Sequence, residues 1–144
     1  MDTTNYLSQI LKVIKRAENL RFSKEKTQFN NSEMRLIEEV VASKIRGERI
    51  ISTQLAESLG VTRSAISQMV NKLEDRNIVK RVADKTDRKI AYIELSPEAE
   101  ELYEKQQALC CESLAKVIEK MGTNKIDSFL SIANELFDTI EETK

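Results

Sequence analysis

Apolar residues recur at helical spacing in four long stretches of the chain. Residues 4–22 and 30–45 each predict one amphipathic helix. Ser96 and Pro97 form an N-cap with proline at the first helical position, and they open a pattern that runs to Met121 and Gly122. A final helix is predicted from Thr123. The apolar stripes are Leu7, Ile10, Leu11, Ile14 and Ala17; Met34, Ile37, Val41 and Ile45; Leu102, Leu109, Leu114 and Val117; and Ile126, Phe129, Leu130, Ala133, Phe137 and Ile140.

Two shorter helical patterns meet at a glycine turn within residues 52–76. Ser52 is the predicted N-cap of the first helix, and Gly60 is expected to end it in the left-handed conformation. The inward positions are Leu55, Ala56 and Leu59, then Ile66, Met69, Val70 and Leu73. The outward positions of the second helix carry short hydrogen-bonding side chains: Ser64, Ser67, Gln68 and Asn71. Such a face is typical of a recognition helix that enters the major groove of DNA.

A β-hairpin is predicted directly after this pair of helices. Val79 and Val82 lead into a charged tip at residues 84–89, and residues 90–95 are rich in strand-forming side chains. The tip carries Lys85, Arg88 and Lys89, whose positive charges complement the potential of a minor groove. The hairpin therefore has the position and charge of a DNA-binding wing.

The order of these motifs resembles the MarR/SlyA family of winged-helix transcriptional regulators. The resemblance is carried by residues 55–81, LAESLGVTRSAISQMVNKLEDRNIVKR, by Asp87-Arg88-Lys89, and by Leu95-Ser96-Pro97. It implies a mainly α (α+β) fold in a single domain over residues 1–144. Residues 30–95 would form the winged helix-turn-helix, and residues 4–22 and 97–141 would supply dimerisation helices.

The sequence departs from the family pattern at two positions. The family's wing usually reads Asp-x-Arg, with the arginine in the minor groove and the aspartate bracing it. Here Lys89 takes the place of that arginine and Arg88 lies beside it, so either cation is a candidate for the groove. Asn77 stands where the family often has glycine, and asparagine also tolerates the left-handed conformation.

The predicted partner is double-stranded DNA, bound by a homodimer. Arg63 is expected to contact phosphate or guanine, and Ser64 and Ser67 to face base edges or phosphates. Gln68 and Asn71 are the predicted adenine readers, because an amide can bond N6 and N7 together. The wing residues are Lys85, Asp87, Arg88 and Lys89. A twofold dimer predicts a pseudopalindromic operator with half-sites roughly 10 base pairs apart, and the resemblance implies repression by occluding a promoter.

A small-molecule effector is implied by the same resemblance. Arg16, Arg21, Phe22 and Phe29 are candidates for its pocket, although they are equally compatible with core and surface positions. Cys110 and Cys111 are either small buried hydrophobes or oxidant sensors. Neighbours on a helix diverge by about 100° and cannot pair with each other, so a redox bridge would have to join two subunits.

Charge is distributed unevenly along the chain, although the net charge is only −1. Residues 61–95 hold 8 Lys/Arg against 5 Asp/Glu, whereas residues 96–144 hold 5 against 11. A basic reading head and an acidic tail fit a protein that presents one face to phosphates. A winged-helix protein-interaction module without operator binding is the alternative, and it would be favoured by an acidic or apolar recognition face.

The absence of histidine removes several classes of chemistry. Histidine-dependent nucleophilic catalysis is excluded, there is no dinucleotide or P-loop motif, and no enzyme, cofactor or metal site is predicted. No segment approaches the roughly 20 apolar residues of a membrane span, and no signal sequence opens the chain. A cytoplasmic protein without a membrane partner is expected.

Overall fold

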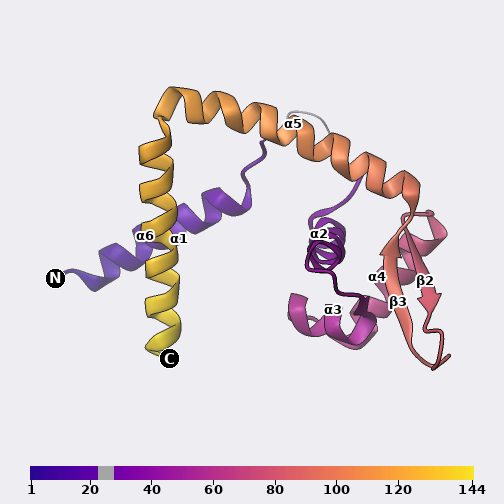
Figure 1. Cartoon of the computed structure of the whole chain (residues 1–144). Helices are drawn as coiled ribbons and strands as arrows, with labels where there is room; N and C mark the ends of the chain where they lie inside the picture. Colours follow the sequence, from indigo (N-terminus) through magenta and orange to yellow (C-terminus); the bar gives the residue numbers. More distant parts are fainter. Residues whose placement is uncertain (23–27) are drawn as a thin grey trace. The chain divides into compact units, whose positions relative to one another are not determined.

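The computed structural model describes residues 1–22 and 28–144, which fall into two units. One unit contains residues 28–107 and the other combines residues 1–22 with residues 108–144. Figure 1 labels the helices of both units and the two longer strands. The fold is mainly helical with one small antiparallel sheet, which confirms the predicted fold class.

The unit of residues 28–107 is a winged helix-turn-helix. It contains α2 (Asn31–Ile45), β1 (Ile50–Ile51), α3 (Ser52–Leu59), α4 (Arg63–Asp75), β2 (Val79–Ala83) and β3 (Ala91–Leu95), and it ends within α5 (Pro97–Met121). The sheet order is β1-β3-β2 with antiparallel neighbours, and Arg81 of β2 pairs with Ile93 of β3. The two-residue β1 was not predicted, because two residues are too short to show an alternating pattern.

The hydrophobic core of this unit draws on every one of its elements. The side chains of Leu36, Leu55, Ile66, Val70 and Leu73 are completely buried. The helix-turn-helix faces predicted from the spacing are confirmed, because Leu55, Ala56, Ile66, Val70 and Leu73 are buried while Leu59 and Met69 pack partly buried against the core. Burial of such side chains, each worth about 1.5–3 kcal/mol, fixes α4 against the sheet.

The predicted inward face of α2 needs correction. Its buried residues are Leu36, Ile37, Val40 and Ser43, whereas Ile45 is 82% exposed. Ile37 is buried as predicted, and Met34 and Val41 pack partly buried against the core, so Ile45 is the one predicted position that is wrong. Leu36 and Val40 were missed, because both candidate faces of this helix carry apolar residues.

Caps define the ends of the helices. Gly60 (φ 66°) adopts the left-handed conformation that ends α3, and Asn77 (φ 57°) adopts it after α4. Ser96 caps α5 by accepting a hydrogen bond from the Ala99 amide at 3.1 Å. The predicted N-cap Ser52 is wrong, because Ser52 is already helical and Ile51 precedes it, with the Gln54 side chain accepting from the Ile51 amide at 3.0 Å.

The second unit contains α1 (Thr3–Glu18), the C-terminal part of α5 and α6 (Thr123–Glu142). The first helix ends at Glu18 rather than at the predicted residue 22, because Asn19 caps it by donating to Lys15 and Ala17 carbonyls. Neither α1 nor α6 has a buried residue. Both helices therefore expose the apolar stripes that their sequences predict. No helix among residues 1–22 and 28–144 is long and apolar enough to cross a membrane.

Candidate nucleic-acid interface

The outward face of α4 carries small polar side chains, as the spacing predicts. Thr62 caps the helix by accepting a hydrogen bond from the Ala65 amide at 3.0 Å. Ser64, Ser67 and Gln68 are exposed. Within the described residues the Gln68 amide makes no hydrogen bond, so both its donor and its acceptor are available to a ligand. Arg63 lies at the first position of the helix, also exposed.

Asn71 differs from Gln68, because a neighbouring strand already engages its amide. The Arg81 guanidinium, on β2, donates to Asn71 Oδ1 at 2.8 Å and to Glu74 Oε1 at 2.7 Å. Arg81 therefore bridges two turns of the recognition helix. Arg81 is not among the predicted site residues, because its separation of ten residues from Asn71 leaves no local signal for the contact.

The tip of the β2–β3 hairpin is organised by one carboxylate. Asp84 Oδ2 accepts from the backbone amides of Asp87 (3.0 Å) and Thr86 (3.1 Å), and from the Thr86 hydroxyl (2.8 Å). Asp84 Oδ1 accepts from the Tyr92 hydroxyl at 2.8 Å. These donors, the Asp87 amide first, hold the pKa of Asp84 far below its usual value, and the contact with Asp84 raises the pKa of Tyr92.

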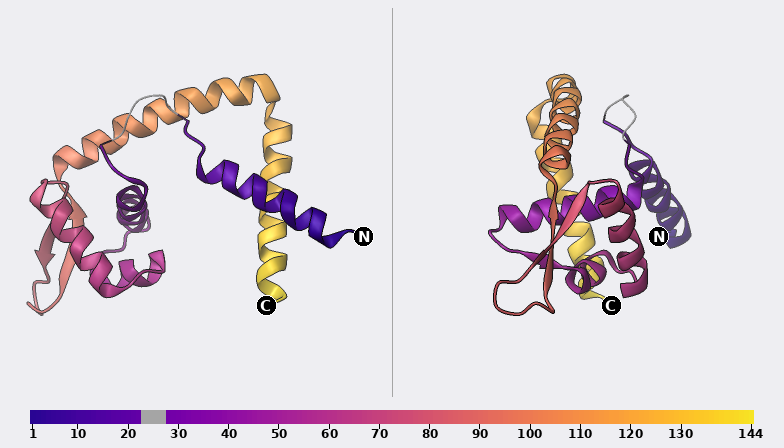
Figure 2. Two further views of the ribbon diagram at one scale, coloured as in Figure 1. Left: turned by 180° about the vertical axis from the view of Figure 1, so that it is seen from behind. Right: turned by 90° about the vertical axis from the view of Figure 1, so that its right-hand side faces the viewer.

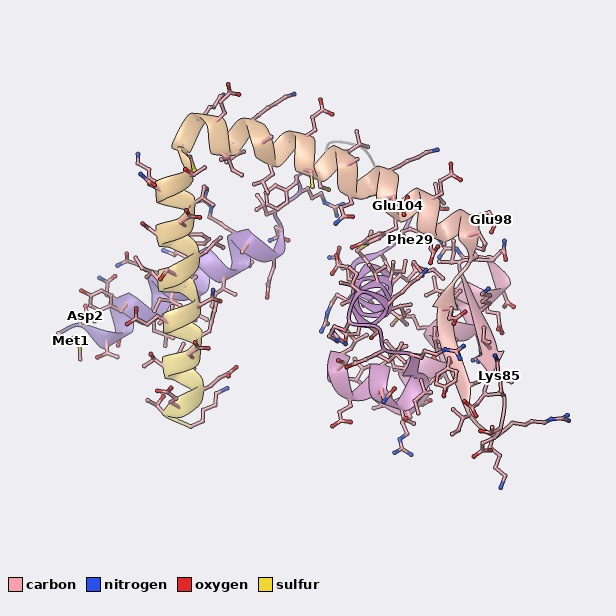
Figure 3. The ribbon with its side chains drawn as sticks, in the orientation of Figure 1. Met1, Asp2, Phe29, Lys85, Glu98 and Glu104 are labelled. Atoms are coloured by element: carbon pink, nitrogen blue, oxygen red, sulfur yellow. The ribbon has the colours of Figure 1, made fainter. Side chains whose placement is uncertain are left out.

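The predicted wing cations lie at this tip. Lys85, Arg88 and Lys89 are exposed, and none of them forms an ion pair within the described residues. Figure 2 shows the loop that carries them at the end of the hairpin, and Figure 3 labels Lys85 there. The Asp87 carboxylate accepts from the backbone amide of Lys89 at 3.0 Å, so it braces the loop rather than a cationic side chain.

The cations elsewhere on this unit divide into paired and unpaired groups. Arg76 pairs with Glu33, Lys80 with Glu94 and Arg81 with Glu74, so these charges are partly neutralised. Of the eight cations in residues 61–95, five have no ion-pair partner in the described part of the chain: Arg63, Lys72, Lys85, Arg88 and Lys89. Within residues 61–95 the unpaired positive charge is therefore confined to α4 and the wing tip.

The base of the wing is stabilised by a second arginine. The Arg49 guanidinium lies 4.0 Å from the centre of the Tyr92 ring and pairs with Glu94 at 3.0 Å. Tyr92 thus joins the base of the wing, through Arg49, to its tip, through Asp84. A cation over an aromatic face contributes about 0.5–1 kcal/mol at exposed sites.

Comparison with known proteins finds the same fold in characterised structures. Residues 35–90 match the model of the MarR family. FabT of Streptococcus pneumoniae, solved in complex with DNA, is 22% identical, with a TM-score of 0.70 over 99% of this chain and 97% of its own. A MarR family protein from Bacillus stearothermophilus is 19% identical, with a TM-score of 0.73 over 99% and 96%.

The chain has the MarR-family fold. The transcriptional regulator PcaV of Streptomyces coelicolor, solved with its natural ligand, is also similar, at 16% identity and a TM-score of 0.62 over 96% of each chain. The resemblance drawn from the helix-turn-helix and the wing is therefore confirmed.

The candidate effector residues of this MarR-like chain lie in different units. Phe29, labelled in Figure 3, is buried in the core of the winged helix, with the Arg76 guanidinium 5.8 Å from its ring centre. Arg16, Arg21 and Phe22 are exposed in the other unit. A cleft of about 590 Å³ within the winged-helix unit is lined by α2, the sheet and α5, and includes Lys44, Glu100 and Ile45, but none of the four predicted residues.

The two cysteines are unpaired and differ in exposure. Cys110 is half-buried, Cys111 is exposed, and both are free thiols. Within the described residues no group of three or more histidine, cysteine or carboxylate side chains is placed to hold a metal ion.

Proposed function

We propose that this MarR-like chain is a sequence-specific DNA-binding transcriptional regulator that acts as a homodimeric repressor. The observation that carries the proposal is the combination of a neutral, hydrogen-bonding face on α4 with unpaired cations at the wing tip. Small polar groups suit base edges, and unpaired cations suit phosphates. The FabT complex with DNA supports the same use of a similar fold.

In the proposed complex α4 enters the major groove. Gln68 is the adenine reader, because its amide is exposed and has no hydrogen bond within the described residues to break. Arg63 takes a phosphate or guanine at the start of the helix. At the tip, the exposed neighbours Arg88 and Lys89 enter a minor groove, and neither has to break an ion pair within the described residues to do so.

The proposed dimer rests on the unburied apolar faces of the terminal helices. In α6, Phe129 is 61% and Phe137 is 49% exposed, and in α1 Leu11 is 54% exposed. Apolar surface of this extent is typical of an interface. A twofold dimer would present two copies of α4 to a pseudopalindromic operator, and occupancy would block a promoter.

An effector is the remaining part of the proposal. The cleft of about 590 Å³ lies within the roughly 300–1,000 Å³ range of small-molecule sites. PcaV, which has a similar fold, was solved with a natural ligand. Oxidation at Cys110 or Cys111 is an alternative input. The second candidate function, a protein-interaction module, is less favoured because α4 presents neither an acidic face nor an apolar anchor.

Selection of bound duplexes from a random DNA library, followed by salt titration, tests the proposal. We expect an enriched pseudopalindrome whose affinity falls steeply with salt. The double variant Arg88→Ala/Lys89→Ala should bind more weakly, and the slope of log K against log[salt] should shrink by roughly 2 per subunit, because about 0.9 counterion is released per phosphate contact.

Lys116→Ala/Lys120→Ala is the matched control, since it removes two cations from the other unit. It should leave the slope unchanged. Absence of any enriched sequence would contradict operator binding and favour the interaction module, whereas an unchanged slope in the wing variant would exclude the wing from the interface.

A further inference from the structure

The contact between Arg81 and Asn71 has a consequence for which base the recognition helix reads. Arginine carries only donors, so the atom of Asn71 that faces the guanidinium must be the amide oxygen. That oxygen lies 2.8 Å from Arg81 Nη2. The positive charge also opposes turning the amide over, since the turned amide would direct its N–H groups at a cation. The amide orientation is therefore fixed by chemistry.

Arg81 is itself held in place. Its second nitrogen donates to Glu74 Oε1 at 2.7 Å, one turn further along the same helix, and its backbone is paired in the sheet opposite Ile93. Its side chain is only 33% exposed. The ion pair with Glu74 and the pairing of β2 hold the guanidinium beside Asn71, which favours the amide orientation described above.

Building on the proposed function, we infer that Arg81 is a positioning residue which makes Asn71 a reader of guanine rather than adenine. With its oxygen bonded to Arg81, Asn71 presents its two N–H donors to the groove. Guanine offers two neighbouring acceptors there, N7 and O6, whereas adenine offers one acceptor beside an N–H₂ donor that would repel the amide. This inference replaces the adenine contact expected of Asn71 from sequence and leaves that of Gln68 in place.

The test is duplex selection with wild type and four variants. The operator position that Asn71 reads is the one that loses its base preference in Asn71→Ala. In wild type we expect guanine at that position, with about tenfold discrimination against adenine. Arg81→Met keeps the length of the side chain but removes its donors, so the amide is free to rotate and adenine should become acceptable there. Lys80→Met is the control, because it changes the adjacent residue of β2, whose ion partner is Glu94. It should retain guanine.

Asn71→Asp supplies a second test, whose result does not depend on whether the Arg81→Met variant folds stably. Aspartate still accepts from Arg81 but has no donor for the groove, so the preference should move from guanine to cytosine, whose N4 is a donor. Three outcomes would overturn this inference without affecting the proposed function. They are adenine at this position in wild type, an unchanged preference in Arg81→Met, and guanine retained in Asn71→Asp. Absence of any motif in wild type would instead overturn the proposed function, and the inference with it.

Discussion

The Asp84 side chain orders the tip of the β2–β3 hairpin. A hairpin tip of this length has backbone amides that strand pairing does not satisfy, and ordering it costs conformational entropy. Asp84 satisfies the amides of Thr86 and Asp87 with one oxygen and anchors the other on Tyr92. The loop that carries the wing cations is thereby tied to the sheet, which would lower the ordering cost of the proposed DNA binding.

Replacing this carboxylate should loosen the wing without unfolding the domain. Asp84→Asn removes the charge that draws the surrounding donors, so the amides of Thr86 and Asp87 should exchange their hydrogens faster, and operator affinity should fall. Amide exchange followed by NMR and duplex binding check this. Asp75→Asn, an exposed carboxylate on α4 without such contacts in the described residues, is the control. Unchanged exchange at residues 86 and 87 would show that the tip is ordered by other contacts.

The same contacts fix the sign of the pH dependence. Because the folded pKa of Asp84 is lowered, its contribution is complete above the ordinary carboxyl value of 3.8 and is lost as the pH falls through the folded value. The wing should therefore keep its order at neutral and mildly acidic pH and lose it only in strong acid. For Tyr92 the folded pKa is raised, so its contribution is present below the ordinary value of 10.0 and is lost as the pH rises through the folded one.

Some contacts of single residues could be predicted from the sequence and others could not. The exposed polar face of α4 follows from helical periodicity alone, and the wing cations follow from their place between two strands. The hydrogen bond between Arg81 and Asn71 depends on how β2 packs beside α4, which no local pattern encodes. Asp84 had a weak local signal, since an Asp side chain in a turn often accepts from the backbone amide two residues on, as Asp84 does from Thr86.

At the scale of elements, the turn between α3 and α4 sets the angle at which the recognition helix is presented. Gly60 takes a φ of 66°, and a Cβ placed there would meet no atom within 4 Å. Glycine is therefore favoured here by its backbone conformation and not by a lack of space. Another residue would cost only the free energy of adopting the left-handed conformation.

Gly60→Ala should destabilise the domain by about 1–2 kcal/mol. Urea unfolding should show a lower midpoint at an unchanged m-value, because the folded contacts are the same. Asn77→Gly is the companion variant, since Asn77 also has a positive φ, at 57°, and glycine accepts that conformation freely. It should change stability little. Equal stability of Gly60→Ala and wild type would mean that the turn adopts another conformation.

Elements with strong periodicity or clear caps were predicted well. Ser96 and Pro97 define the start of α5, Gly122 separates α5 from α6, and the hairpin follows from its β-formers. The errors occur where tertiary packing decides. Packing against α3 and the sheet buries Leu36 and Val40 of α2 and leaves Ile45 exposed, which the spacing alone does not show. The strand β1 exists only because Ile50 and Ile51 pair with Ile93 and Tyr92.

At the scale of the whole molecule, the two units differ in how they satisfy their apolar residues. The winged helix buries a complete core of its own. The helices α1 and α6 bury none of their residues and expose, among others, Leu7, Leu11, Phe129 and Phe137. Burial of apolar surface stabilises by about 25 cal/mol per Å², so such faces favour association. The proposed dimer is therefore supported by energetics as well as by symmetry.

Charge placed on this face should separate the subunits. Leu11→Glu puts a carboxylate into the apolar stripe of α1, where burial without a partner costs several kcal/mol, so sedimentation should show a shift from dimer to monomer. Operator affinity should fall with it, because a monomer contacts one half-site only. Lys12→Glu is the matched control: it introduces the same side chain one residue away, off the stripe, and changes the net charge by more. A dimer that persisted in Leu11→Glu would place the interface elsewhere, and a monomer that still bound the full operator with wild-type affinity would separate DNA binding from dimerisation.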